Sequence, residues 1–104
     1  MGIIRFYENN ILHLDNKTTF QNKDDFNDYV LVLGQYVISL ESLGKYSKAI
    51  KYADKLLQLI DLKKEEFDIN IKDFTTYWSI LTSKGRSHYF YIFVSQTILS
   101  VTTN

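Results

Sequence analysis

The chain has 104 residues, a length typical of one domain, and 45% of them are hydrophobic, which excludes a chain that is disordered throughout. Twelve Lys and Arg balance twelve Asp and Glu, so the basic excess of a nucleic-acid-binding domain is missing and no nucleic-acid partner is expected. The absence of Cys excludes disulfide bonds and thiolate metal sites.

Membrane and export signals are not predicted. The longest uninterrupted apolar run, residues 89–94, is far shorter than the roughly 20 residues that span a membrane. Arg5 and Glu8 interrupt the start of the chain, so it does not resemble a secretory signal. The sequence does not fix the compartment, and a cytoplasmic location is favoured.

The first predicted helix spans residues 3–14. Its pattern Ile-Arg-Phe-x-Glu-x-x-Ile-x-x-Leu-Asp begins at Ile4 and returns in similar form from Ile50, 46 residues later. A pattern that recurs at such a distance is typical of helical repeats. We therefore expect residues 3–14 to be a helix of the same type as the later segment.

The next two predicted helices, 23–43 and 46–62, form a first hairpin over residues 23–62. In the former, apolar residues recur four and three positions apart, as on one face of a helix: Phe26, Val30, Leu33, Val37 and Leu40. Asp24 and Asp25 are expected to cap its start, and Gly44 its end. The latter has the same periodicity at Ala49, Ile50, Ala53, Leu56, Leu57 and Ile60. Such a short connection predicts antiparallel helices.

A second, degenerate hairpin is expected over residues 70–102, with helices at 70–91 and 93–102. The pattern Asp-Phe-x-x-Tyr-Val-x-x-Leu from Asp25 returns as Asp-Phe-x-x-Tyr-Trp-x-x-Leu from Asp73, 48 residues later. Aligning Gly85 with Gly44 instead matches fewer positions. Because no Gly marks the second turn, the alternative is one unbroken helix across the predicted turn, which would invite domain swapping.

The central hairpin resembles a tetratricopeptide repeat. The string Gly-x-Tyr-x-x-Ala-Ile from Gly44 looks like the family's turn and the start of its second helix. The residues that carry the resemblance are Leu33, Tyr36, Leu40, Gly44, Tyr46, Ala49, Ile50 and Leu57. The distance between copies is about 48 residues instead of the family's 34. A different solenoid of helical hairpins is the alternative.

The resemblance implies an all-α fold, with antiparallel hairpins stacked as a short solenoid of about five helices in one domain over residues 1–104. The first helix has no preceding partner and the last is short. We therefore expect the chain to be a piece of, or completed by, something larger. The alternative is that the first and last helices are caps, because terminal repeats are often atypical.

A protein-interaction function is also implied by the resemblance, with the first helix of each hairpin lining a concave face. The positions on that face are Leu31, Gly34, Ile38 and Glu41 in the first copy and Ser79, Thr82, Arg86 and Tyr89 in the second. Only Arg86 is suited to bind a peptide carboxylate. The expected partner is therefore an apolar or amphipathic segment of a protein or peptide.

The segment Tyr-Phe-Tyr-Ile-Phe-Val at 89–94 would be apolar on every side of a helix. Such a helix must pack on a further repeat, on a second copy of the chain or on a partner. We expect core packing against a further element, and a homodimer joined through this segment is the alternative. Phe90 and Phe93 therefore join the expected partner-binding residues.

No catalytic, metal or cofactor site is predicted, so the chain is not expected to be an enzyme. His13 and His88 are isolated from each other and from any further metal ligand. No phosphate-binding loop or nucleophile motif occurs. A small-ligand site around His88 and Arg86 is a third, separate hypothesis for the function.

Overall fold

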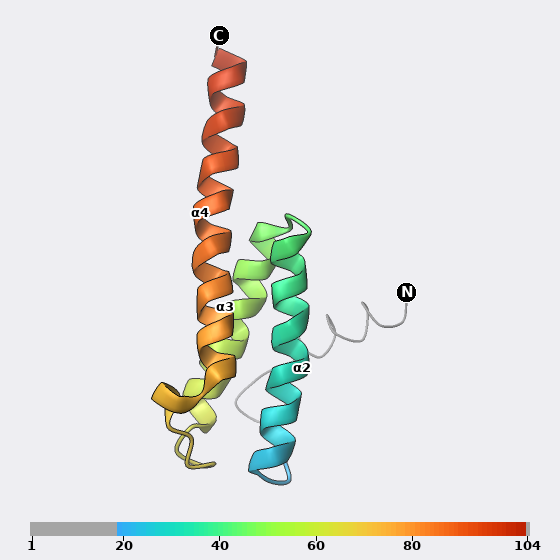
Figure 1. Ribbon diagram of the computed structural model, residues 1–104, viewed down its shortest axis with the longest axis vertical. Coiled ribbons are helices and arrows are strands. Elements are labelled where there is room, and N and C mark those ends of the chain that lie inside the picture. Colours follow the sequence, from blue (N-terminus) through green and yellow to red (C-terminus); the bar gives the residue numbers. More distant parts are fainter. Residues whose placement is uncertain (1–18, 104) are drawn as a thin grey trace, which may run out of the picture.

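The structure is a computed structural model that describes the backbone of residues 19–103 and the side chains of residues 19–98. The described part is all-helical and contains no strand, which confirms the all-α prediction (Figure 1). Its elements are α2 (Lys23–Ser42), α3 (Tyr46–Lys63), the 3-10 turn η1 (Ile71–Asp73) and α4 (Thr75–Thr103). The predicted leading helix at 3–14 lies outside the described residues.

The start of α2 is capped by Asn22, one position before the helix. The Asn22 side chain accepts a hydrogen bond of 2.9 Å from the backbone N–H of Asp25. The Asp25 carboxylate in turn accepts one of 3.1 Å from the N–H of Gln21. Asp24 and Asp25 lie in the first turn, where negative charge opposes the positive end of the helix dipole. Asp25 thus takes part in the cap as expected, but the cap residue itself is Asn22.

Gly44 makes the reversal between α2 and α3 possible. Its φ of 76° lies in the left-handed region, which costs other residues steric strain. In this conformation the N–H of Lys45 donates to the carbonyl of Leu40 at 2.9 Å, closing the last turn of α2. The two helices run antiparallel side by side (Figure 1). This arrangement is the hairpin that was predicted over residues 23–62.

The hairpin core forms where the apolar stripes of α2 and α3 meet. All five stripe residues predicted for α2 are buried: Phe26, Val30, Leu33, Val37 and Leu40. Ala49 and Ala53 of α3 are fully buried, and their small side chains let the two backbones approach. The rings of Tyr36 and Tyr52 stack across the two helices with centroids 6.2 Å apart. Each large side chain buried here contributes roughly 1.5–3 kcal/mol.

α4 is a single helix of 29 residues, so the prediction of two helices at 70–91 and 93–102 is wrong and the alternative of one unbroken helix is confirmed. Between Gly85 and the end of α4 there is no Gly or Pro to interrupt the backbone hydrogen bonding. The helix also starts later than predicted, because residues 71–73 form η1. A solenoid of about five helices is therefore not seen in the described part of the chain.

The first half of α4 packs against both helices of the hairpin. Ile80, Ser83 and Ser87 are fully buried, and the Lys84 ammonium lies 2.6 Å from the Asp54 carboxylate of α3. A Cβ atom added to Gly34 of α2 would lie 3.2 Å from the Ile80 side chain, so α2 and α4 approach closely there. The second half of α4 extends beyond the end of the hairpin (Figure 1). Within the described residues, no helix combines the length and apolar character needed to cross a membrane.

We predict that Gly44→Ala lowers the free energy of unfolding by about 1 kcal/mol, because alanine is strained at a left-handed φ. No atom within 4 Å would clash with the new Cβ, so the cost is the backbone's alone. Urea unfolding followed by circular dichroism measures it.

Gly85→Ala is the matched control, since its added Cβ also meets nothing within 4 Å but the residue lies inside α4. This change is expected to stabilise the protein by about 0.5–1 kcal/mol, because alanine loses less backbone entropy in a helix. Effects of the same sign at the two positions would contradict this description of the turn.

Candidate interaction surface

The concave face predicted from the sequence is a shallow depression between α2 and α4. Leu31, Gly34, Ile38 and Ser79, all predicted for this face, line one cavity of about 160 Å³. Sites for small molecules and peptide side chains are commonly 300–1,000 Å³. The close approach of Gly34 to Ile80 limits its depth. The depression therefore accepts at most one side chain.

Glu41 and Arg86, predicted as two further positions of that face, bind each other. The Arg86 Nε and Nη2 groups donate to the two Glu41 carboxylate oxygens at 2.7 and 2.9 Å. The Ser83 hydroxyl donates to the same carboxylate at 2.8 Å. The Glu41 side chain is only 12% exposed, whereas that of Arg86 is 51% exposed. This pair joins α2 to α4, and Arg86 already holds a carboxylate from its own chain.

The hydrogen bonds from Arg86, and to a smaller extent that from Ser83, hold the pKa of Glu41 below its ordinary value although burial opposes this. The same pairing raises the pKa of Arg86. Both groups are therefore charged at neutral pH, and the link between α2 and α4 is a charge-assisted one.

The remaining predicted site residues lie on α4. Thr82 is exposed beside the ion pair, and Tyr89, Phe90 and Phe93 are exposed further along the helix. The Phe90 ring stacks on Tyr46 at the start of α3, with centroids 5.8 Å apart. Beyond this contact with the hairpin, α4 continues for a further thirteen residues.

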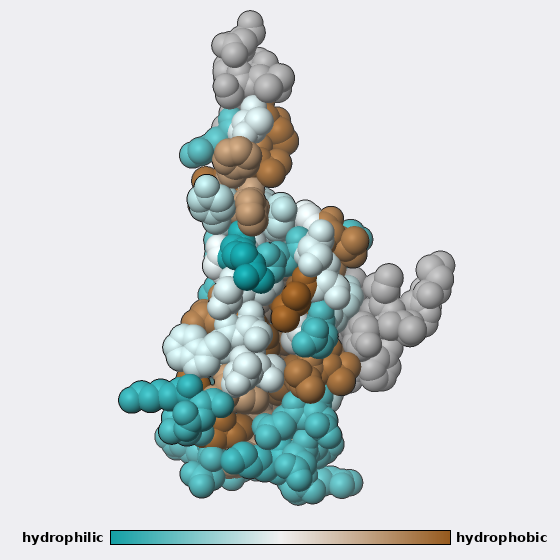
Figure 2. Space-filling model, viewed as in Figure 1, coloured by the Kyte–Doolittle hydropathy of each residue, from teal (hydrophilic) through white to brown (hydrophobic). Residues whose placement is uncertain are grey.

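The second half of α4 carries a continuous apolar surface, shown in part in Figure 2. Its large exposed side chains, here called the α4 apolar surface, are Tyr89, Phe90, Tyr91, Ile92, Phe93, Val94 and Ile98. From Ser87 to Thr103 the sequence has no Asp, Glu, Lys or Arg. Surfaces of this kind mark contacts with another protein more often than they are left in water.

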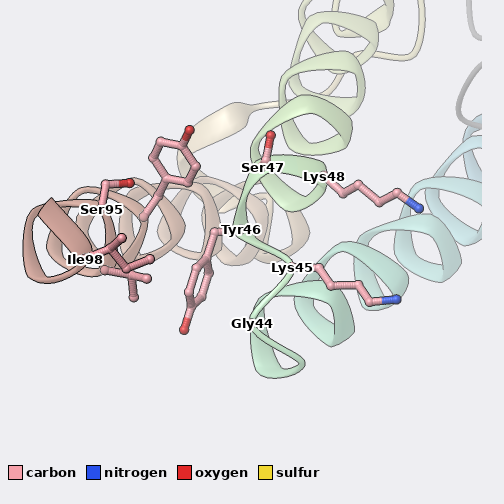
Figure 3. A pocket seen from close by; sticks show the side chains of 9 residues that line it. Gly44, Lys45, Tyr46, Ser47, Lys48, Ser95 and Ile98 are labelled. Carbon is pink, nitrogen blue, oxygen red and sulfur yellow. The ribbon is translucent and has the colours of Figure 1, made fainter. Parts of the chain in front are cut away.

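A groove lies between this part of α4 and the start of α3. It has a volume of about 580 Å³ and is lined by Gly44, Lys45, Tyr46, Ser47 and Lys48 on one side and Tyr91, Val94, Ser95 and Ile98 on the other. Tyr46 extends between the two walls, and Lys45 and Lys48 point away from α4 (Figure 3). In the sequence, Tyr46 stood out only as one of the residues that carry the tetratricopeptide resemblance. The groove wall at Gly44–Lys48 was not predicted from the sequence, because the groove exists only where α4 runs past the turn between α2 and α3.

His88, around which a small-ligand site was considered, is exposed on α4. Among the described residues, no three His, Asp or Glu side chains gather in the way that a metal ion requires. The groove is lined mainly by apolar groups and hydroxyls, and by Lys45 and Lys48, whose side chains point away from α4 (Figure 3). The chemistry that it offers is contact with an apolar partner.

No protein-family model matches the chain, and neither a curated protein nor a solved structure is significantly similar to it. The tetratricopeptide resemblance therefore rests on the residues of the hairpin. Inferences about function rest on the geometry described above.

The Glu41–Arg86 pair predicts a specific pH dependence of stability. Because the folded protein lowers the pKa of Glu41 below its ordinary value of 4.5, the ionised carboxylate stabilises the fold above that pH. This contribution is lost as the pH falls through the lowered value. The difference in unfolding free energy between the wild type and Glu41→Gln should be largest at neutral pH and shrink below pH 4.5.

Urea unfolding at a series of pH values measures this difference. Glu65→Gln is the control, since Glu65 is exposed in the loop after α3 and its replacement removes one carboxylate without touching α4. A gap between wild type and Glu41→Gln that stays constant down to pH 3 would show that the pair does not act as described.

Proposed function

We propose that this chain is a protein-interaction module in which the α2–α3 hairpin fixes α4 and the second half of α4 binds another protein chain. The observation that carries the proposal is the α4 apolar surface, which is uncharged and, apart from the contact of Phe90 with Tyr46, largely exposed. The module is of helical-repeat, tetratricopeptide-like type. The left-handed Gly44 and the fully buried Ala49 support that part of the proposal.

The size of the apolar surface limits what a partner can gain by covering it. Aromatic side chains bury about 150–250 Å² each, so four half-exposed aromatics and three aliphatic residues present on the order of 600 Å². At roughly 25 cal/mol per Å², covering this area contributes about 15 kcal/mol before the costs of association. Those costs are about 4–15 kcal/mol, the same size as the contribution, so a partner must cover most of the surface to stay bound.

The internal repeat explains why α4 accepts a further helix. With the offset of 48 residues, Val30, Val37 and Leu40 of α2 correspond to Trp78, Gly85 and His88 of α4. In α2 these positions are buried in the hairpin core. In α4 they are exposed, Trp78 by 46%. α4 therefore corresponds to the first helix of a hairpin, and in the described residues no second helix covers it.

The predicted concave face supports binding less well. Its depression between α2 and α4 is small, and Glu41 and Arg86 are engaged with each other across it. A peptide carboxylate would have to displace Glu41 from a bidentate pair to reach Arg86. We therefore propose the second half of α4 as the main contact and assign Leu31 and Ile38 no more than an auxiliary role.

Site-specific photo-crosslinking in cells tests this proposal. A benzoyl-phenylalanine residue at Tyr91 is expected to form a covalent adduct with another polypeptide, identified by mass spectrometry. The same residue placed at Leu31 is the matched control, because Leu31 is 45% exposed and Tyr91 49% but they lie on different surfaces. No adduct from position 91, or adducts from position 31 alone, would refute the assignment of this surface.

A further inference from the structure

We propose that the partner of the α4 apolar surface is a second copy of this chain, with the two α4 helices antiparallel about a two-fold axis near Val94 and Ser95. This inference rests on the proposed function and names its partner. It follows from the charge, the shape and the helix ends of the surface.

Charge favours a second copy. No Asp, Glu, Lys or Arg occurs between Ser87 and Thr103, so this surface offers an acidic or basic partner nothing with which to pair. A second copy presents the same uncharged face of α4, so the contact between the two α4 helices buries no charge. Lys45 and Lys48 on the opposite wall of the groove are exposed and point away from α4, so their ammonium groups stay in water (Figure 3). The whole chain has a formal net charge of zero, so long-range repulsion does not oppose the approach of two copies.

Shape favours a symmetric arrangement. Tyr91, Val94, Ser95 and Ile98 form one face of α4, at spacings of three and four residues, and this face is one wall of the groove. In a two-fold dimer each α4 lines its own groove and enters the groove of the partner copy, so one surface meets itself. Val94 and Ser95 are small enough at the centre to let two helix axes approach to about 8–10 Å.

The helix ends favour the antiparallel order. α3 starts without a side-chain cap and without an acidic residue in its first turn, so the positive end of its dipole is uncompensated. The last turn of α4 has no basic residue to oppose its negative end. About nine residues, or roughly 13 Å, separate the proposed axis from the end of α4. Phe90 lies four to five residues from the axis, or roughly 7 Å, so the last turns of α4 pass the Phe90–Tyr46 stack of the partner copy, where α3 begins.

The area corresponds to a small interface between two copies. A standard protein–protein interface buries about 800 Å² on each partner. Of the α4 apolar surface, Tyr91, Val94 and Ile98 lie on the groove face, and half-exposed side chains of this size present on the order of 250 Å². The opposite wall of the groove, at residues 44–48, supplies further area when α4 of the partner copy enters it.

Light scattering coupled to size-exclusion chromatography tests the inference on the full chain. The wild type is expected at twice the 12.3 kDa chain mass. Val94→Glu should weaken dimerisation by about a hundredfold or more, because it places two carboxylates side by side at the axis. Val94→Lys should do the same, and an equimolar mixture of the two variants should restore the dimer by pairing opposite charges.

Gln96→Glu is the matched control on the same helix. Gln96 is exposed like Val94 and does not belong to the α4 apolar surface, and two residues along a helix point to nearly opposite sides. Gln96→Glu should therefore leave the dimer within about threefold of its wild-type stability, while circular dichroism verifies that all variants stay helical.

A chain that is monomeric at every concentration would overturn the dimer. So would equal sensitivity to Val94→Glu and Gln96→Glu, or a mixture of the Val94 variants that stays monomeric. If the chain is monomeric but benzoyl-phenylalanine at position 91 crosslinks a different protein, the proposed function stands and only the second copy is wrong. A monomeric chain that forms no adduct would refute both the dimer and the proposed function.

Discussion

The mismatch in length between α4 and the hairpin determines the rest of this structure. α4 has 29 residues, whereas α2 has 20 and α3 has 18. At 1.5 Å per residue, α4 is about 44 Å long and the hairpin helices are about 27–30 Å. Because the helix has no break after Gly85, roughly ten of its residues cannot contact the hairpin. The apolar surface and the groove beside α3 are both consequences of that excess length.

The two halves of α4 are consequently built for different surroundings. The first half packs on the hairpin through Ile80, Tyr77 and Leu81. Two buried serines and two ion pairs add to this contact, those of Lys84 with Asp54 and of Arg86 with Glu41. These directional contacts fix the position and rotation of the helix. The second half has aromatic and aliphatic side chains and no charge, so it is suited to burial against another chain. A rigid anchor and an apolar extension thus share one helix.

Much of the hairpin could be predicted from the sequence because its signals are local. The stripe from Phe26 to Leu40 lies within one helix, and Gly44 has the left-handed conformation that a glycine at a helix end indicates. Asp25 takes part in the N-terminal cap, although Asn22 is the residue that caps α2. Helices 23–43 and 46–62 were consequently placed to within one residue of their observed ends.

The features that escaped prediction depend on contacts between distant residues. The internal repeat suggested a second hairpin at 70–102, but no residue there favours a turn, and helix propensity determined the outcome. Glu41 and Arg86 are far apart in the sequence, and their pairing depends on how α4 rests on α2. The groove wall at Gly44–Lys48 could be found only after α4 was known to pass the turn. Its signal in the sequence was the absence of glycine after Gly85.

A distance along α4 tests the continuity of this helix most directly. The chain has no Cys, so spin labels can be attached at Thr82→Cys and Thr97→Cys, two exposed positions in the two halves of α4. One unbroken helix places these positions about 22 Å apart, at 1.5 Å for each of fifteen residues. Double electron–electron resonance, with labelled chains diluted in unlabelled protein, should give this separation plus the reach of the labels. A hairpin that folds back near Ile92 would bring the two positions to about 12 Å, given an interhelical distance of about 10 Å, and that result would contradict the account.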